Sequence, residues 1–305
     1  AITGRVHSLA TTAASAGMSP IARLQHDLIG WQGIAALRKL DDSLTQSTAL
    51  EDFAAQVEKL HAHLRAADWE ALLVAEAGAV DEVTSTLGKQ WQGIGRSAQA
   101  TLALPALREV RRECWVVNSQ VSFCAKAYPT VPSGHADAAA LTVLGAFLRN
   151  GFLHRAIREQ GGAYGGGASH DASVAAFRFY SYRDPRIEGT LDDFDASVRW
   201  MLSENHASAP LEEAILGVIG SLDKPGSPAG EAKQDFHSRR FGRDYEQRMA
   251  FRQSVLAVSL EDLRRVAETY LKPEAASVAV VTGAGPYENS RSYLEGLGLT
   301  RRELG

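Results

Sequence analysis

The stretch from Leu153 to Ser169, LHRAIREQGGAYGGGAS, constrains the fold more than any other part of the chain. Apolar residues at helical spacing run up to Gly161-Gly162, and three more glycines follow Tyr164. Glycine permits positive φ angles and close approach of another backbone. The stretch therefore predicts a helix that ends at Gly161 and a tight loop that returns into a strand, with Arg158 and Tyr164 on either side of the turn.

Two interpretations of this pair follow from the residues alone. In the first, which composition favours, the pattern is purely structural: Gly161 follows the helix, Tyr164 packs on a sheet and Arg158 is solvated. In the second, a guanidinium and a phenol, both hydrogen-bond donors, stand at the mouth of a loop that another backbone can approach. A phosphate-binding loop is excluded, because such loops run from a strand into a helix N-terminus and often carry Gly-Lys-Ser/Thr.

Four runs of the sequence carry a family resemblance. The run IREQGGAYGGG, with FRFYSYRDP from Phe177 to Pro185, resembles the C-terminal half of the insulinase/pitrilysin-type zinc peptidases, in particular their presequence-protease-like branch. The run from Arg239 to Leu271 is similar to a helical segment of that family. The run from Ala14 to Leu40 resembles the preceding domain of the same branch. Together these runs cover most of the chain.

The resemblance implies an α+β fold with two insulinase-type domains. Residues 1–91 are expected to form only the mostly helical C-terminal part of a third insulinase-type domain, and residues 92–110 a linker. Residues 111–305 are expected to form a complete fourth domain. Its mainly antiparallel sheet should be packed by helices on one side.

The resemblance also implies roles for the glycine stretch. In the family, the arginine and tyrosine that match Arg158 and Tyr164 reach the active site in the N-terminal half of the enzyme. Tyr164 is then expected to donate to the oxyanion or to a substrate carbonyl, and Arg158 to hold the substrate main chain or orient the tyrosine. The expected substrate-binding positions are the residues that flank the pair: Gly161, Gly162, Ala163, Gly165 and Gly166.

The metal site of that family is missing from this sequence. The family binds zinc through a His-x-x-Glu-His motif, and none of the nine histidines lies in that motif or in its inverse. His61 and His63 are two positions apart on a predicted helix, so their side chains point to different sides. We therefore expect no metal ligands in this chain, and zinc only in the full-length enzyme.

Serine-hydrolase chemistry is a poor explanation of the sequence. No Gly-x-Ser-x-Gly motif is present. Ser169, His170 and Asp171 are adjacent in sequence, whereas the members of a catalytic triad usually meet only through the fold.

Bulk properties exclude some partners. A formal net charge of −4 gives no overall attraction to nucleic acid or anionic membranes, and no apolar run approaches the ~20 residues that span a bilayer. Cys114 and Cys124 fall in one predicted strand, where ten residues would separate them by ~33 Å, beyond disulfide reach. Free thiols favour a reducing compartment, and a cytoplasmic location is predicted.

Periodicity predicts the remaining elements. Helices are expected up to about residue 65 and from residue 80 to about 91, and Thr190 with Asp193 resembles a capping pair for a helix through Leu202. Strands are expected over three segments: an alternating run from about 115 to 126, residues 174–182 and residues 278–282. The run ALLVA, residues 71–75, suits a short buried strand.

These observations favour the C-terminal, substrate-binding half of a zinc metalloendopeptidase that encloses and degrades unfolded peptides. Its partner would be the N-terminal catalytic half of the same enzyme, and the chain alone would be inactive. The alternative is a non-catalytic scaffold or partner subunit homologous to such peptidases, which a search for His-x-x-Glu-His upstream would distinguish. A third hypothesis, that the chain is a stand-alone small-molecule enzyme, has only the glycine stretch in its support.

Overall fold

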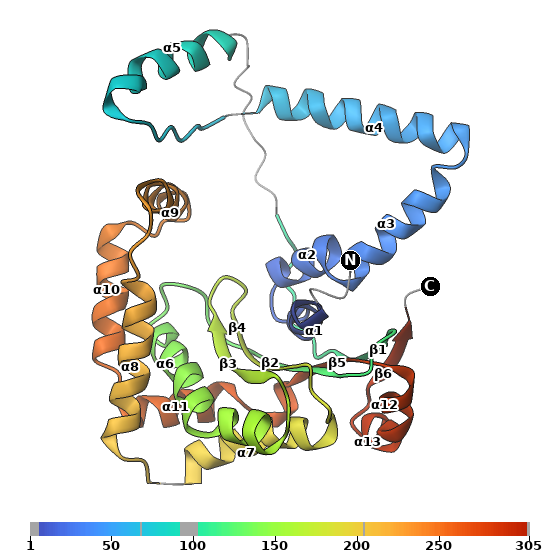
Figure 1. Ribbon diagram of the computed structural model, residues 1–305, viewed down its shortest axis with the longest axis vertical. Helices are drawn as coiled ribbons and strands as arrows, with labels where there is room; N and C mark the ends of the chain where they lie inside the picture. Colours follow the sequence, from blue (N-terminus) through green and yellow to red (C-terminus); the bar gives the residue numbers. More distant parts are fainter. Residues whose placement is uncertain (1–5, 68, 92–102, 204, 304–305) are drawn as a thin grey trace. The chain divides into compact units, whose positions relative to one another are not determined.

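A six-stranded sheet organises the fold in the computed structural model, which describes residues 6–67, 69–91, 103–203 and 205–303 (Figure 1). The strand order is β3-β4-β2-β5-β1-β6. Pairing is antiparallel from β3 through β4 and β2 to β5, and parallel between β1 and its neighbours β5 and β6. The predicted α+β fold with a mainly antiparallel sheet is confirmed. The strands are β1 (Arg112–Val116), β2 (Phe123–Pro129), β3 (Gly165–Asp171), β4 (Ala176–Tyr182), β5 (Ser277–Thr282) and β6 (Thr300–Glu303).

One face of the sheet is covered by helices that follow β1 in the sequence. Alternate residues of the strands point to this face: Phe177 and Phe179 of β4 are fully buried in its core, next to Leu144 and Ile157. The covering helices are α6 (Ala138–Leu148), η3 (Arg149–Gln160), α7 (Glu188–Ser203) and α11 (Leu260–Tyr270). The helix packing expected for the region after residue 111 is therefore present.

The opposite face is covered by the N-terminal helix. Helix α1 (Val6–Ser15) buries its apolar side against strand residues such as Phe123 and Val281. Helix α2 (Pro20–Ile29) begins after Ser19, whose side chain accepts the Ala22 N–H. At the start of α3 (Trp31–Ser43), the fully buried Trp31 stacks on Trp115 of β1, with ring centroids 5.1 Å apart.

The chain divides into two compact units. One unit contains the described residues of 1–35, 104–223 and 249–305, and the other those of 36–103 and 224–248. The N-terminal segment thus shares a unit with the sheet, although the predicted domains divide the chain at residue 91. The assignment of residues 1–91 to a third insulinase-type domain stays a prediction, and residues 92–102 of the predicted linker lie outside the described ranges.

The predicted long strand from about 115 to 126 is wrong, because the chain turns between β1 and β2. Ser119 closes that turn, since its hydroxyl donates to the Val121 carbonyl and accepts the Val121 N–H. Both strands then pair with β5, and Cys114 and Cys124 lie on either side of Val280. The two thiols are buried and unpaired with each other. Burial raises the pKa of Cys114 to about 12 and raises that of Cys124 further.

Residues 71–75 do not form the predicted buried strand. They belong to no strand, and Leu72 and Val74 are exposed. Four helices of the unit formed by residues 36–103 and 224–248 also have no buried residue. They are α4 (Ser47–Ala66), η2 (Ala77–Ala79), α5 (Val80–Gln90) and α9 (Pro228–Arg240).

The remaining elements complete the C-terminal region. Ser259 begins α11 with a capping box, because its hydroxyl accepts the Asp262 N–H and the Asp262 carboxylate accepts the Ser259 N–H. The other elements are α8 (Ser208–Leu222), α10 (Tyr245–Leu256), η4 (Pro273–Ala275), α12 (Ala284–Asn289) and α13 (Arg291–Gly296). None of the helices in the described part of the chain is both long and apolar enough to cross a membrane.

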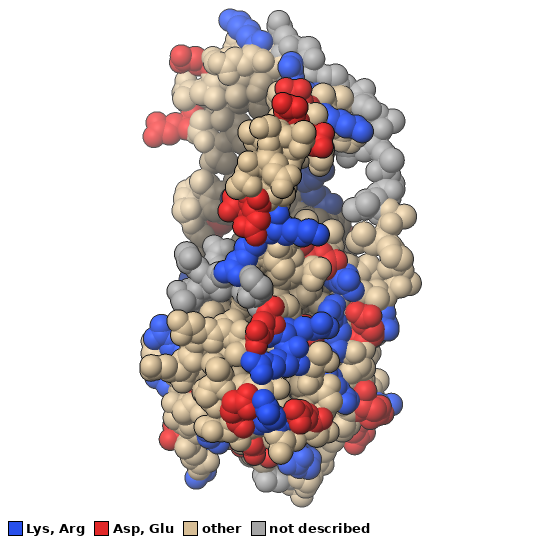
Figure 2. All heavy atoms as spheres, turned by 90° about the vertical axis from the view of Figure 1, so that its right-hand side faces the viewer, with Lys and Arg blue, Asp and Glu red and all other residues tan. Residues whose placement is uncertain are grey.

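Surface charges are mixed rather than segregated on the face drawn in Figure 2. Lys and Arg side chains lie there beside Asp and Glu side chains. Several charges form short-range ion pairs, such as Arg291–Glu288 at 2.7 Å. Exposed pairs of this kind contribute at most about 1 kcal/mol each to stability, so they shape the surface field more than the fold.

Candidate functional site

Arg158 lies near the end of η3, the helix that leads into the glycine turn. This helix is wound as a π-helix over its whole length, a rare geometry that often occurs at functional sites. The Arg158 carbonyl accepts the N–H groups of Gly161 and Gly162, which closes the helix. Its guanidinium is exposed and makes no hydrogen bond or ion pair with any other described residue. The main chain at Arg158 is therefore fixed while the charged group stays free.

The turn after η3 requires glycine at two positions. Gly162 has φ of +77°, the left-handed region that residues with a Cβ rarely adopt. A Cβ atom on Gly161 would overlap the guanidinium of Arg186. Ala163 follows with a buried side chain, and its N–H donates to the Ile157 carbonyl at 3.1 Å. The turn is thus held by the Arg186 guanidinium on one side and by the hydrogen bond to Ile157 on the other.

Tyr164 leaves the turn with its phenol exposed; 68% of the residue's surface is accessible. Its N–H donates to the Arg183 carbonyl over 3.4 Å. Its ring meets the edge of Tyr182, with centroids 5.5 Å apart, and Tyr182 in turn contacts His7 of α1 at 5.0 Å. The phenol of Tyr164 is therefore free to meet a ligand, while its ring is supported from behind.

Strand β3 begins directly after Tyr164, where the sequence predicts only a loop. Gly165 pairs with Tyr182, and Gly166 and Gly167 continue the antiparallel ladder with β4. A Cβ on Gly166 would come within 2.8 Å of the Ile157 side chain, so glycine lets η3 lie close to the strand. At Gly165 the same Cβ would meet open space, which leaves the backbone next to Tyr164 accessible.

The structure therefore brings the two predicted donors to one short turn, both exposed. Of the predicted substrate-binding positions, Gly162 is exposed, a Cβ on Gly165 would meet open space, and the side chain of Ala163 faces the core. A guanidinium and a phenol can donate to carbonyl or carboxylate oxygens, and both can do so without breaking an existing contact. Substrate contact by these residues stays a prediction.

The neighbouring Ser169-His170-Asp171 run is occupied by structural contacts. The His170 Nε2 contacts the Val131 carbonyl at 3.1 Å, and burial lowers the pKa of its imidazole. Burial alone would raise the pKa of Asp171, but the Arg178 guanidinium and Ser173 outweigh it and hold that pKa below its usual value. These contacts give the run no triad geometry.

The described residues contain no group of three or more His, Cys, Asp or Glu side chains that could hold a metal ion. A structural or catalytic zinc ion needs at least three such side chains converging on one point. The side chains of the described ranges therefore do not fit a zinc centre.

Side chains outside the glycine stretch support the turn, mainly Arg186 and Tyr182, and the sequence alone did not point to them. The predicted capping pair is also wrong, since α7 already begins at Glu188. The Thr190 hydroxyl donates to the buried Asp184, and Asp193 binds Arg186. The Asp184-Pro185 pair after β4 was the sequence signal for this supporting segment, because Asp and Pro are typical turn residues.

Residues 112–283 match the family described as "PreP C-terminal domain". The chain belongs to this family. The matched region extends from β1 to the end of β5 and includes Arg158 and Tyr164.

Relatives of this PreP C-terminal domain chain are mitochondrial presequence proteases. The protein of Yarrowia lipolytica is 41% identical over 163 residues, which is 53% of this chain and 16% of the relative. That of Eremothecium gossypii is 30% identical over 289 residues, 92% of this chain and 29% of the relative. The chain thus spans less than a third of either relative.

The fold is also that of solved peptidase structures. Pitrilysin aligns with a TM-score of 0.53 and 14% identity over 74% of this chain and 25% of its own. At this identity the match concerns the fold alone. Together with the family match, it confirms the resemblance to insulinase/pitrilysin-type peptidases of the presequence-protease-like branch.

The predicted cytoplasmic location is wrong. Both relatives are named as mitochondrial proteins. The prediction used the free cysteines, and unpaired thiols indicate a reducing compartment without specifying which one.

Proposed function

We propose that this chain is the C-terminal, substrate-binding half of a mitochondrial zinc metalloendopeptidase that encloses and degrades unfolded peptides of the presequence type. The catalytic metal and base would lie in the N-terminal half of the same polypeptide. The family match and the names of the relatives support the assignment. Within this chain, the two exposed donors on one glycine turn carry the proposal.

The proposed role of the pair follows from the charge that develops during peptide hydrolysis. The scissile carbonyl oxygen becomes an oxyanion in the transition state, and preorganised donors stabilise it most where water is excluded. Tyr164 would donate its hydroxyl proton to that oxygen or to a neighbouring carbonyl. Arg158 would bind the substrate main chain or orient the phenol. The fixed backbone of the turn places both residues side by side before the substrate binds, and the free side chain of Arg158 is then ordered by the contact.

A single substitution in the complete enzyme tests this role. Tyr164→Phe removes only the donor, so we expect kcat for a presequence peptide to fall about 100-fold, the usual effect of losing one oxyanion donor. The melting temperature should stay unchanged, because the hydroxyl has no partner among the described residues. Tyr245→Phe is the control, since Tyr245 is also exposed, at 66%, but lies on α10. An unchanged kcat in Tyr164→Phe would remove the residue from the mechanism.

The 305-residue chain by itself should hydrolyse no fluorogenic peptide. Chelator-sensitive cleavage by this chain alone would overturn the division of labour between the halves. If the complete polypeptide lacks the His-x-x-Glu-His motif and cleaves nothing, the scaffold function replaces the peptidase function.

A further inference from the structure

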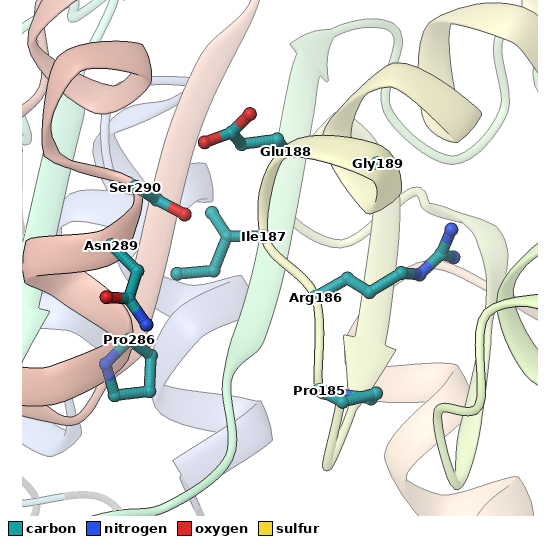
Figure 3. A pocket seen from close by; sticks show the side chains of 8 residues that line it. All are labelled: Pro185, Arg186, Ile187, Glu188, Gly189, Pro286, Asn289 and Ser290. Carbon is teal, nitrogen blue, oxygen red and sulfur yellow. The ribbon is translucent and has the colours of Figure 1, made fainter.

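Arg186 connects the segment after β4 to the end of the helix that carries Arg158. Its Nη2 donates to the Ala156 carbonyl of η3 at 3.3 Å and to the Asp193 carboxylate at 2.9 Å. Figure 3 shows its side chain extending away from Pro286, Asn289 and Ser290, which line the hollow on the other side of the segment. Arg186 is itself one of the residues that line the hollow, and its guanidinium is directed at η3.

The contact with Gly161 makes this arrangement specific. The guanidinium fills the space that a Cβ on Gly161 would need. The last carbonyls of a helix lack partners within the helix, and a cation placed there complements the helix dipole. Arg186 thus supplies a donor and a positive charge at the end of η3, directly before the turn.

The other end of the segment holds Tyr164. The Arg183 carbonyl accepts the Tyr164 N–H, and the Arg183 guanidinium lies 5.6 Å above the Tyr182 ring that supports Tyr164. Arg183 has φ of +50°, in the left-handed region that a residue with a side chain adopts only when its surroundings enforce it. Strain of this kind clusters at functional sites.

The residue that follows Arg183 is fixed by hydrogen bonds of both its carboxylate and its backbone. Asp184 is fully buried; it accepts the Arg186 N–H at 3.0 Å and the Thr190 hydroxyl at 2.7 Å. Its backbone N–H and carbonyl both pair with Ser122, each at 2.8 Å. The segment is therefore fixed to the strand region at Ser122 and to α7 at once.

We propose that the segment Arg183–Arg186 is a clamp that positions Arg158 and Tyr164, with Arg186 as the main positioning residue. Arg186 fixes the helix end and Gly161 on one side of the turn, and Arg183 fixes the main chain of Tyr164 on the other. The clamp acts through the two donors and touches no substrate. Its link to catalysis rests on the proposed function, whereas its effect on the turn does not.

Hydrogen exchange on the 305-residue chain tests the clamp without any activity. In Arg186→Ala, the amides of Gly162 and Ala163 should exchange at least tenfold faster, because the helix end that holds them loosens. Arg186→Lys keeps the charge without the forked donor and should give an intermediate rate. Arg252→Ala is the control, since Arg252 also pairs with an aspartate, Asp223. Unchanged exchange in Arg186→Ala would overturn the proposal.

Asp193→Asn provides a second variant if Arg186→Ala does not fold. It leaves Arg186 in place but weakens one of its two anchors, so exchange at Gly162 and Ala163 should rise less than in Arg186→Ala. No change in this variant, together with no change in Arg186→Lys, would also overturn the clamp.

Kinetics in the complete enzyme separate the clamp from the proposed function. Arg186→Ala should lower kcat about tenfold with KM changed less than twofold, and should have little further effect in a Tyr164→Phe background. If Tyr164→Phe lowers kcat and Arg186→Ala does not, the clamp fails. If exchange rises but neither variant affects kcat, the clamp stands and the proposed function fails.

Discussion

Helices α1 and α4 are both amphipathic in sequence, yet they end in opposite environments. Helix α1 has ten residues and buries six of them, of which five lie in the core that it shares with the sheet. Helix α4 has 20 residues and buries none, although Leu50, Val57, Leu60 and Leu64 recur at helical spacing. The contrast shows that periodicity predicts a helix and its apolar side, but not which surface covers that side. Stability should therefore depend on α1 and its neighbours far more than on α4.

The largest effect is expected at Trp31, which joins the N-terminal segment to the sheet. Trp31→Ala removes a fully buried ring that stacks on Trp115, and should lower the free energy of unfolding by about 3–5 kcal/mol. Guanidinium denaturation followed by circular dichroism measures this. A loss below about 1 kcal/mol would mean that the N-terminal segment is not part of the sheet unit.

A smaller effect depends on pH and involves His170 on β3. Burial lowers the pKa of His170 below its ordinary value of 6.5, so the unfolded chain binds this proton more readily than the folded one. Stability should therefore fall as the pH drops below about 6.5, by at most about 1.4 kcal/mol per pH unit for this histidine. Denaturation midpoints between pH 8 and 5 should show a flatter profile for His170→Gln.

Two comparisons control that measurement. His26, whose pKa is also lowered by burial, should keep part of the pH dependence in the variant. His63→Gln makes the same substitution at an exposed residue of α4 and serves as the matched control. A profile that is equally steep in wild type and His170→Gln would exclude His170 as a source of the dependence.

The smallest effect is expected on α4 itself. Leu60 is 56% exposed, and alanine is a better helix former, so Leu60→Ala should change the free energy of unfolding by less than about 0.5 kcal/mol. A loss above about 1 kcal/mol, measured by the same denaturation, would show that α4 has a partner in solution. The comparison with α1 would then no longer hold.

Local chemistry explains what the sequence predicted correctly. The helix before Gly161 follows from its apolar spacing and its glycine stop. Strand β5 is buried at every position, and its run of apolar residues predicted it. In each case the residues themselves carry the signal.

Tertiary contacts explain what the sequence could not predict. Strand β3 has glycines where side chains would show alternation, so its strand character comes from pairing with β4. The turn between β1 and β2 was hidden because Val117 and Val121 keep the alternation across it. At the candidate site, Arg158 and Tyr164 were found through local pattern and resemblance. Arg186 was not, because its contacts with η3 span 30 positions.

The position of α1 has a practical consequence for anyone who trims this protein. A polypeptide reduced to residues 112–283, the segment that matches the family, would keep the glycine turn but lose helix α1 from the face of the sheet that it covers. Trp115, Phe123 and Val281 would then be exposed to water as a hydrophobic patch, and such patches promote self-association. A shortened version of the domain that stays monomeric must therefore retain α1, which lies outside the segment that matches the family.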